Sequence, residues 1–434
     1  MFERSDPLTI YMHIAQRAAL LKIFSESQVG RTALRKARPA QTATGVPEWV
    51  LREEPVHKYF TTDGYWPVQE DTRLGGYLVR RKLGWGPNST VWLALYRHGS
   101  SLTALKVMTG AATKHLAGLP DALRRMRIQS PTHPGHAHVA RVLDHFYHPS
   151  FNKNHMCVAM EPLSEDLQTF SARWPGPGGL PSGLARRVVR QVVQALDFLH
   201  TECRVVHAAI APEHIMLASV PPADIRPAIA IADRAPTWRT TVPPDGVRLA
   251  LTPSLPLPVA LPSGGATSLD AWRHVSVKLL PDLYSLARTR KSRARAAAAL
   301  RLPHLCAPEV CLGASGGTPA DVWSIGCLAF ELAMGHPLLS RDIASEHVPR
   351  ALAAHFGELP HPLGKRGKYR QPYLNDNGSM KGSKVEPISV AEVVGRAPPA
   401  DAGLLIDFLN HVFILDPSQR PSARELLKHK WLQP

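Results

Sequence analysis

Hydrophobic and polar positions follow different patterns in the two parts of the chain. Up to about residue 160, apolar residues come in short runs interrupted by turn residues, which is typical of β-strands. The clearest runs lie at 77–83, 103–106, 138–146 and 155–160. Beyond a break rich in proline and glycine at 174–182, apolar residues recur every three or four positions, which predicts a long helix. That helix carries Leu184, Val188, Val192, Leu196 and Leu199 on one face.

The composition is that of a globular protein with some irregular length. Its 434 residues and 44% hydrophobic content allow a large buried core, whereas its 40 prolines indicate that part of the chain is irregular. The formal charge of +16 favours partners that are acidic or carry phosphate.

The cysteines and the apolar runs indicate in which cellular compartment the protein is expected. The five cysteines are scattered without a Cys-x-x-Cys pair, and four of them fall in segments typical of apolar core, which argues against a disulfide framework or a zinc site. No apolar run is long enough to cross a bilayer, and the start of the chain lacks the order of a secretory signal. We therefore expect a soluble protein of the cytoplasm, the nucleus or both, without membrane contact.

Two stretches lie outside the regular patterns. Residues 1–58 form an N-terminal extension whose amphipathic segment at 8–24 allows a transit-peptide interpretation, but its acidic residues favour a loosely packed, partly disordered extension. Residues 236–302 are rich in Pro, Ala and Arg, and their basic run at 288–295 suits a nuclear address or a nucleic-acid contact. Because aromatic residues do not interleave with that run, we expect a solvated, disordered loop and no specific nucleic-acid binding. An unspliced or mistranslated insert is an alternative.

A glycine-rich turn follows the first predicted strand. Gly84 and Gly86 let the backbone turn tightly and approach phosphate oxygens, although Pro87 removes one backbone amide at the tip. A Gly-x-Gly turn alone is a weak signal, but Lys106 follows at the spacing of a paired strand. The combination favours a nucleotide site over a solvated surface lysine.

The segment 207–217, which reads His-Ala-Ala-Ile-Ala-Pro-Glu-His-Ile-Met-Leu, resembles the catalytic loop of the eukaryotic protein kinases. It is similar to that of the SR-protein kinases, whose loop resembles His-Thr-Asp-Ile-Lys-Pro-Asp-Asn-Ile-Met-Leu. Further motifs agree with the resemblance: Ala-Pro-Glu at 307–309, Asp-Val-Trp-Ser-Ile-Gly at 321–326, Asp-Pro-Ser-Gln-Arg-Pro at 416–421, and an insert at 369–380. The resemblance covers residues 59–235 and 302–434.

The resemblance implies an α+β fold of two lobes in a kinase-like domain at 59–434. The small N-lobe, mostly β with one helix, is expected at about 59–161, and the larger, mostly α C-lobe at about 162–434. The insert at about 236–302 then lies in the activation segment. The resemblance also implies that Glu309 and Arg420 form a buried ion pair and that His207 and Asp321 have structural roles.

An ATP site and a metal site are implied as well. Asp233 stands at the magnesium position, with an ordinary turn aspartate as the alternative, and Ala235 replaces the usual glycine. The helix predicted at 121–129 offers only Asp121 near the usual glutamate position, so we expect no ordinary lysine–glutamate pair at Lys106. The implied ATP-binding residues are Leu83, Gly84, Trp85, Gly86, Pro87, Asn88, Ser89, Val91, Ala104, Lys106, Met160, Glu161 and Leu163.

The chain departs from the family at the reacting groups. Ala209 stands at the position of the catalytic base, Ala211 at that of the phosphate-facing lysine, and His214 at that of the second metal ligand. If each loss costs about ten- to a thousand-fold, little phosphoryl transfer remains. We therefore expect an ATP-binding pseudokinase with a weakened magnesium site, which acts by binding proteins, Arg/Ser-rich proteins among them. The alternatives are an active Ser/Thr kinase of Arg/Ser-rich proteins, in which His207, Glu213 or His214 substitutes, and a decaying gene without function.

Overall fold

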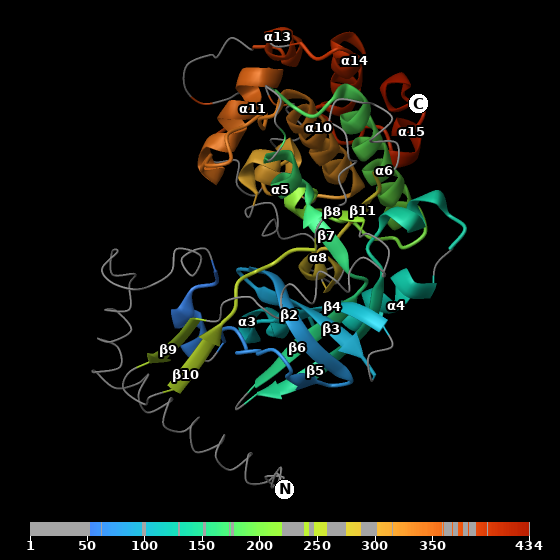
Figure 1. Ribbon diagram of the computed structural model, residues 1–434. Helices are drawn as coiled ribbons and strands as arrows, with labels where there is room; N and C mark the ends of the chain where they lie inside the picture. Colours follow the sequence, from blue (N-terminus) through green and yellow to red (C-terminus); the bar gives the residue numbers. More distant parts are fainter. Residues whose placement is uncertain are drawn as a thin grey trace, which may run out of the picture. The chain divides into compact units, whose positions relative to one another are not determined.

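The computed structural model describes residues 53–61, 63–97, 101–128, 131–150, 153–172, 174, 178–218, 238–242, 247–257, 275–287, 302–314, 316–357, 359, 367, 372–375, 381, 388–396 and 398–433. The chain divides into two units (Figure 1). The first comprises Met1–Ala117, Val142–Pro162 and Pro221–Leu257, and the second comprises Gly118–Arg141, Leu163–Val220 and Pro258–Pro434. The helix predicted at 8–24 and the metal-binding turn predicted at 229–235 lie outside the described residues.

A six-stranded antiparallel sheet with the order β1-β2-β3-β4-β6-β5 organises the first unit (Figure 1). The strands predicted at 77–83, 103–106 and 155–160 are confirmed as parts of β2, β4 and β6. The strand predicted at 138–146 begins later than expected, because Pro134–His138 forms the 3-10 helix η3. The strands are β1 Arg73–Leu74, β2 Tyr77–Gly86, β3 Ser89–Tyr96, β4 Ser101–Met108, β5 Val142–Ser150 and β6 Lys153–Met160.

Alternation along these strands gives the sheet an apolar face. Residues two apart on a strand point to the same side, so every second residue joins the same layer. Two short helices accompany the sheet, η2 at Val56–Phe60 and α3 at Gly110–Lys114, and α3 packs against β6. The apolar layer includes Val79, Trp92, Ala94, Leu105, Val107, Cys157 and Ala159.

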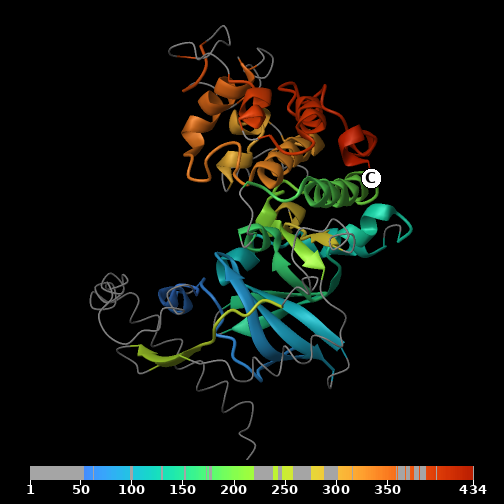
Figure 2. The ribbon, with the colours of Figure 1, turned by 45° about the horizontal axis from the view of Figure 1, so that its top comes forward.

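The predicted insert at 236–302 contains regular structure in its described parts, whereas the basic run at 288–295, for which a disordered loop is expected, lies outside the described residues. Strands β9 (Trp238–Val242) and β10 (Val247–Leu251) pair antiparallel, and this hairpin stands apart from the six-stranded sheet in Figures 1 and 2. Strand β11 (Val277–Leu279) and helix α8 (Leu283–Ala287) follow in the second unit. Valine, threonine and tryptophan in the hairpin favour extended structure, which the neighbouring prolines obscured.

Helices make up most of the second unit (Figure 2). Its three strands form a separate small sheet with the order β11-β8-β7, in which β7 is Leu163–Asp166 and β8 is Ile215–Ala218. The α-helices other than α8 are α4 Leu119–Ile128, α5 Leu167–Ala172, α6 Ser182–Thr201, α9 Pro308–Cys311, α10 Thr318–Met334, α11 Val348–Phe356, α13 Val390–Gly395, α14 Ala402–Val412 and α15 Ala423–Leu426. The remaining 3-10 helices are η4 Pro212–His214, η7 Pro303–Leu305, η8 Ser345–His347 and η9 Lys430–Leu432.

Helices α6 and α10 form the centre of this unit. The long helix predicted from the repeat of apolar residues is α6, and all five residues of that repeat are buried. Helix α10 packs against α6 and against α14. Gly326 permits the second contact, because a Cβ at this position would lie 2.6 Å from the Phe413 ring. Among the described residues, no helix has the length and apolar character needed to span a membrane.

Candidate active site

The glycine-rich turn connects β2 and β3 within the first unit. Pro87 and Asn88 form the turn itself, since Gly86 pairs with Ser89 and Gly84 pairs with Val91. A Cβ added at Gly84 or Gly86 would meet no heavy atom within 4 Å, so the space beside both residues is open. A phosphate group fits such a space, and a side chain would fill it. The Tyr65 hydroxyl donates a hydrogen bond to the Gly86 carbonyl at 2.8 Å and so anchors the turn.

Strand register brings several predicted ATP-binding residues onto one face of the sheet. Val91 lies directly opposite Lys106, and Ala104 lies opposite Met160. Directly opposed residues in antiparallel strands share a face, as do residues two apart on one strand. Val91, Ala104, Lys106 and Met160 therefore point to the same side, opposite to the apolar layer around Leu105.

The remaining predicted ATP-binding residues are divided between the two units. Leu83 packs beside Leu93, and Trp85 is 37% exposed in the turn. Glu161 follows β6 directly, and Leu163 begins β7 in the second unit. The roles of these residues in ATP binding stay predictions.

Asp321 holds the start of the catalytic loop in the second unit. Its carboxylate accepts hydrogen bonds from the backbone N–H groups of His207, at 2.8 Å, and Ala208, at 2.7 Å. It also lies 2.8 Å from His200 Nε2 on helix α6. Asp321 is 1% exposed and lies in the first turn of α10. Its buried charge therefore links the loop to both central helices, α6 and α10.

His207 links the loop to the segment that follows β11. Its Nδ1 accepts a hydrogen bond from Ala209 N at 3.3 Å, so the proton belongs on Nε2, which donates to the Leu280 carbonyl at 2.6 Å. Leu280 N in turn donates to the His214 carbonyl at 2.8 Å. His207 is buried, and the structural role that the resemblance implied for it stays a prediction.

The three positions that lack their usual reacting groups lie within this hydrogen-bonded loop. Ala209 is 7% exposed and Ala211 is fully buried. His214 turns its Nδ1 toward the Ala209 carbonyl at 2.6 Å, and because a carbonyl only accepts, Nδ1 carries the proton. Burial, assisted by the nearby His207 ring, lowers the pKa of His214.

A second group of charges surrounds the end of the loop. Arg341 pairs with Glu331, and its Nη1 lies 3.9 Å from Glu213 Oε2. Burial raises the pKa of Glu331, against the opposing effect of Arg341. His304 is 5% exposed, and neither of its ring nitrogens has a hydrogen-bond partner among the described residues. Burial, followed by the Arg341 cation, lowers the pKa of His304. Arg341 and His304 were not predicted from the sequence, because the charged groups that surround His304, Arg341 and Glu213, are distant from it in the chain.

An acidic residue after β11 was also missed. Strand β11 pairs with β8, the strand that leaves the catalytic loop, and Asp282 follows it three residues later. The Asp282 carboxylate interacts electrostatically with His214 and opposes the lowering of its pKa. Asp233, the residue predicted to bind magnesium, lies outside the described residues. Within the described part of the chain, no three His, Cys, Asp or Glu side chains gather as a metal site.

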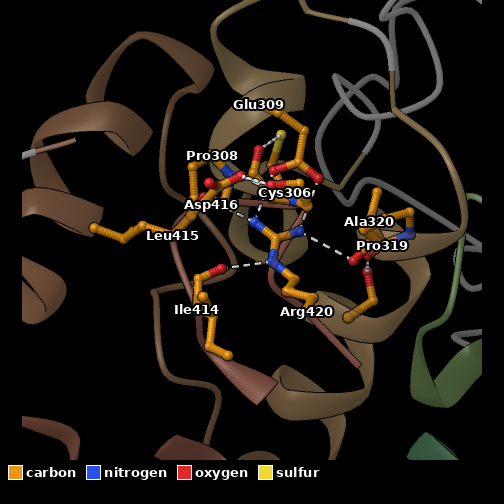
Figure 3. A network of polar contacts seen from close by, with 12 residues as sticks. Cys306, Pro308, Glu309, Pro319, Ala320, Ile414, Leu415, Asp416 and Arg420 are labelled. Atoms are coloured by element: carbon orange, nitrogen blue, oxygen red, sulfur yellow. Dashed lines mark hydrogen bonds and ion pairs between the residues drawn. The ribbon is translucent and has the colours of Figure 1, made fainter. Parts of the chain in front are cut away.

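The predicted ion pair between Glu309 and Arg420 is present (Figure 3). Two parallel hydrogen bonds of 2.8 Å join Arg420 Nη1 and Nη2 to the two carboxylate oxygens. The other guanidinium donors reach the carbonyls of Ile414, Leu415 and Pro319. The guanidinium also lies 5.0 Å from the Trp323 ring centroid. We call these residues the Arg420 cluster, in which both buried charges are fully hydrogen-bonded.

Comparison with known proteins agrees with this geometry. The protein kinase domain family matches residues 77–233 and 283–432 of the chain. Protein kinase dsk1 of Schizosaccharomyces pombe is 24% identical and covers 93% of this chain and 89% of its own length. The serine/threonine-protein kinase SRPK of Physarum polycephalum is 26% identical over 85% of this chain and 89% of its own. Human SRSF protein kinase 3 is 25% identical over 88% and 90%.

A solved structure supports the fold. The crystal structure of a kinase domain superposes with a TM-score of 0.59 at 20% identity, and the match covers 85% of this chain and 99% of that one. The sheet of the first unit and the helices of the second accordingly form a bilobal α+β kinase fold. The chain belongs to the protein kinase family and, within it, is similar to the SR-protein kinases.

Proposed function

We propose that this protein is a pseudokinase of the SR-protein kinase group, which holds ATP, transfers phosphate poorly and acts by binding other proteins. The proposal rests on a contrast between two sets of residues at one loop: those that hold its backbone and those at the reacting positions. The groups that hold its backbone, His207 and Asp321, are present and hydrogen-bonded. The positions at which kinases orient the hydroxyl and face the phosphate are the methyl groups of Ala209 and Ala211.

ATP binding is proposed on the sheet face that carries Val91, Ala104, Lys106 and Met160. The open space beside Gly84 and Gly86 supports it, because phosphate oxygens need close approach to backbone N–H groups there. Lys106 would supply the cation for the phosphates, and Glu161, which directly follows β6, would contact the adenine. Kinases as a family use ATP with magnesium. For the metal we propose Asp233, with Asp282 as a second acidic candidate, and a weakened site because His214 replaces an amide ligand.

The partner class follows from the relatives and from charge. Relatives named for SR proteins point to Arg/Ser-rich proteins as partners. The chain itself carries a formal charge of +16, which repels unmodified arginine-rich segments and attracts phosphorylated ones. We therefore favour stable binding to phosphorylated or mixed-charge partners over turnover of cationic substrates. Placement in the cytoplasm or nucleus stays a prediction.

The second candidate function is an active Ser/Thr kinase of Arg/Ser-rich proteins. The observation in its favour is that two carboxylates, Glu213 and Asp282, act electrostatically on His214 inside the loop. His214, flanked by these carboxylates, is the candidate acid–base group near the position of the missing base.

Assays on one preparation of purified protein distinguish the two candidate functions. Purified protein is tested for transfer of labelled phosphate from ATP to itself and to an Arg/Ser peptide, beside a Lys106→Met variant. The proposal expects a rise in melting temperature with ATP and magnesium, absent in the variant, and no transfer above the variant. Transfer that disappears with Lys106→Met establishes the second candidate. If ATP leaves the melting temperature of the wild type unchanged, the proposed nucleotide site is wrong.

A further inference from the structure

Two cysteines flank the Ala-Pro-Glu motif in the second unit. Ala307 is the N-cap of helix α9, which runs from Pro308 to Cys311. Cys306 therefore stands one residue before the cap, and Cys311 is the fourth residue of the helix. Side chains at these two positions meet across the first turn of a helix, where apolar pairs commonly pack against each other. The local backbone geometry thus brings two thiols together.

The contacts of the two thiols agree with this placement. The Cys306 side chain hydrogen-bonds to that of Cys311, and its thiol also donates to the Ala307 carbonyl at 3.6 Å. The Cys311 thiol donates to the Pro308 carbonyl at 3.1 Å. The backbone between the two residues is held as well, since Cys311 N donates to the Ala307 carbonyl at 3.1 Å. Both sulfur atoms therefore lie at the same turn of α9.

The two thiols differ in exposure. Cys306 is buried, and Figure 3 shows it beside Glu309. Cys311 is only partly buried, and it packs at the edge of a small apolar cluster that contains Leu312 and Leu374. The hydrogen bond to Cys311, followed by burial, raises the pKa of Cys306, which therefore keeps its proton. An oxidant from solvent consequently reaches Cys311 first, while the protonated Cys306 thiol is already in contact with it.

A third cysteine of the second unit lies nearby. Cys327 is buried on α10, and its burial raises its pKa to about 12. It acts electrostatically on Cys306, but the side chain to which it hydrogen-bonds is that of Trp323. Cys327 is therefore the alternative partner of Cys306 that an experiment has to exclude.

We propose that Cys306 and Cys311 are a redox-sensitive pair that closes to a disulfide when hydrogen peroxide oxidises Cys311. In the first step the Cys311 sulfur attacks a peroxide oxygen, so that an S–O bond forms, the O–O bond breaks and water leaves. In the second step the Cys306 sulfur attacks the sulfenic sulfur of Cys311. The S–S bond forms, the S–O bond breaks, and the hydroxide leaves with the Cys306 proton as a second water. The two thiols lose two electrons in total, and these reduce one peroxide molecule.

Two features favour closure over other products. Contact between the thiols makes the second step intramolecular, so it competes well with further oxidation of Cys311 to the sulfinic acid. Disulfides in reducing compartments are mostly transient and redox-sensing, and a thiol reductant reopens a pair of this kind. Glu309 lies inside the loop that the disulfide closes, so the oxidised pair fixes the turn that carries one partner of the Arg420 cluster. The inference is independent of the proposed function.

The test treats the full-length wild type with hydrogen peroxide, then alkylates the denatured protein with N-ethylmaleimide and maps the tryptic peptides by mass spectrometry. Residues 302–340 contain no lysine or arginine, so Cys306, Cys311 and Cys327 fall in one peptide. Without peroxide this peptide should carry three maleimides. After peroxide it should carry one, on Cys327, and be lighter by the two hydrogen atoms lost in the disulfide. A thiol reductant added before alkylation should restore all three.

Matched variants and internal thiols make the result specific. Cys311→Ala should abolish the reversible loss of two thiols, whereas Cys327→Ala should retain it. In Cys306→Ala, Cys311 should stay as a sulfenic acid, trapped by dimedone, or proceed to the sulfinic acid. Because Cys311 is only partly buried, Cys311→Ala provides the test even if Cys306→Ala does not melt cooperatively. The buried Cys157 and Cys203 of the same samples should remain fully alkylatable.

Four results would overturn the inference. They are three maleimides on the wild-type peptide after peroxide, a disulfide that includes Cys327, a sulfinic acid on Cys311 beside an alkylatable Cys306, or equal loss of thiols at Cys157 and Cys203. No ATP is present in this experiment. Its failure therefore leaves the pseudokinase proposal untouched, and phosphate transfer by the wild type would overturn that proposal alone.

Discussion

The catalytic loop and the Arg420 cluster lie in the same unit, and in both a buried carboxylate accepts hydrogen bonds from neighbouring groups. Asp321 accepts two hydrogen bonds from the loop and one from His200 on α6, and Glu309 accepts two from Arg420 in the cluster. In the cluster both charged partners are present. In the loop only the groups that contact the protein are present, while those expected to face nucleotide and substrate are Ala209 and Ala211. Residues needed for folding and residues needed for phosphoryl transfer are thus separable, even within one loop.

The largest expected effect comes from rebuilding the loop. Ala209→Asp, Ala211→Lys and His214→Asn together restore the three missing groups on a backbone that Asp321 and His207 already hold. We expect phosphate transfer about 10²- to 10⁴-fold above the wild type, measured with labelled ATP and an Arg/Ser peptide. Adding Lys106→Met to the rebuilt protein is the control and should remove the gain. A rebuilt protein that folds and binds ATP without transfer would contradict the claim that the frame is intact.

The Arg420 cluster should respond in stability instead. Arg420→Met leaves the Glu309 carboxylate buried without its cation, so we expect a loss of about 3–5 kcal/mol in the free energy of unfolding, measured with urea. The double variant Glu309→Leu, Arg420→Met removes both charges and should recover most of that loss. Equal loss in the single and double variants would mean that packing, rather than charge, dominates this cluster.

Backbone strain in the loop predicts a smaller effect of opposite sign. Ala208 has a φ of 62°, in the left-handed region that disfavours a Cβ, and its side chain is exposed. Ala208→Gly should therefore raise the free energy of unfolding by about 0.5–1 kcal/mol. Ala344 is exposed in an extended conformation, so Ala344→Gly should lower it by a similar amount. Destabilisation by both substitutions would show that the Ala208 conformation is not strained.

The smallest expected effect is on pH dependence. A histidine whose pKa is lower in the folded protein binds more protons when unfolded, so its contribution is complete above pH of about 6.5 and declines as the pH falls below that value. His304→Leu should make the loss of stability between pH 7 and pH 5 shallower, measured by urea unfolding at each pH. His347→Leu, at a side chain that is 72% exposed, should leave the slope unchanged. An unaltered slope in His304→Leu would contradict the prediction.

Local patterns were enough to predict much of the fold. The apolar repeat of α6 and the runs of β2, β4 and β6 are short-range features, because side-chain direction repeats every 3.6 or two residues. The ion pair of Glu309 and Arg420 was predicted from the two family motifs that contain these residues, although the residues lie 111 positions apart. The hairpin β9–β10 was missed, because prolines around it outweighed its β-forming residues.

Tertiary contacts decided what no local pattern contains. Lys82 lies in strand β2 and is buried, because Glu53 and Glu54 approach it from 29 and 28 positions away. Ser254 completes that network from 201 positions beyond Glu53. A buried charge is tolerated only where its partners converge, and convergence depends on the folded backbone rather than on neighbours in the chain. The identity of the loop residues could therefore be predicted from the sequence, whereas the buried network of Glu53, Lys82 and Ser254 became visible only in three dimensions.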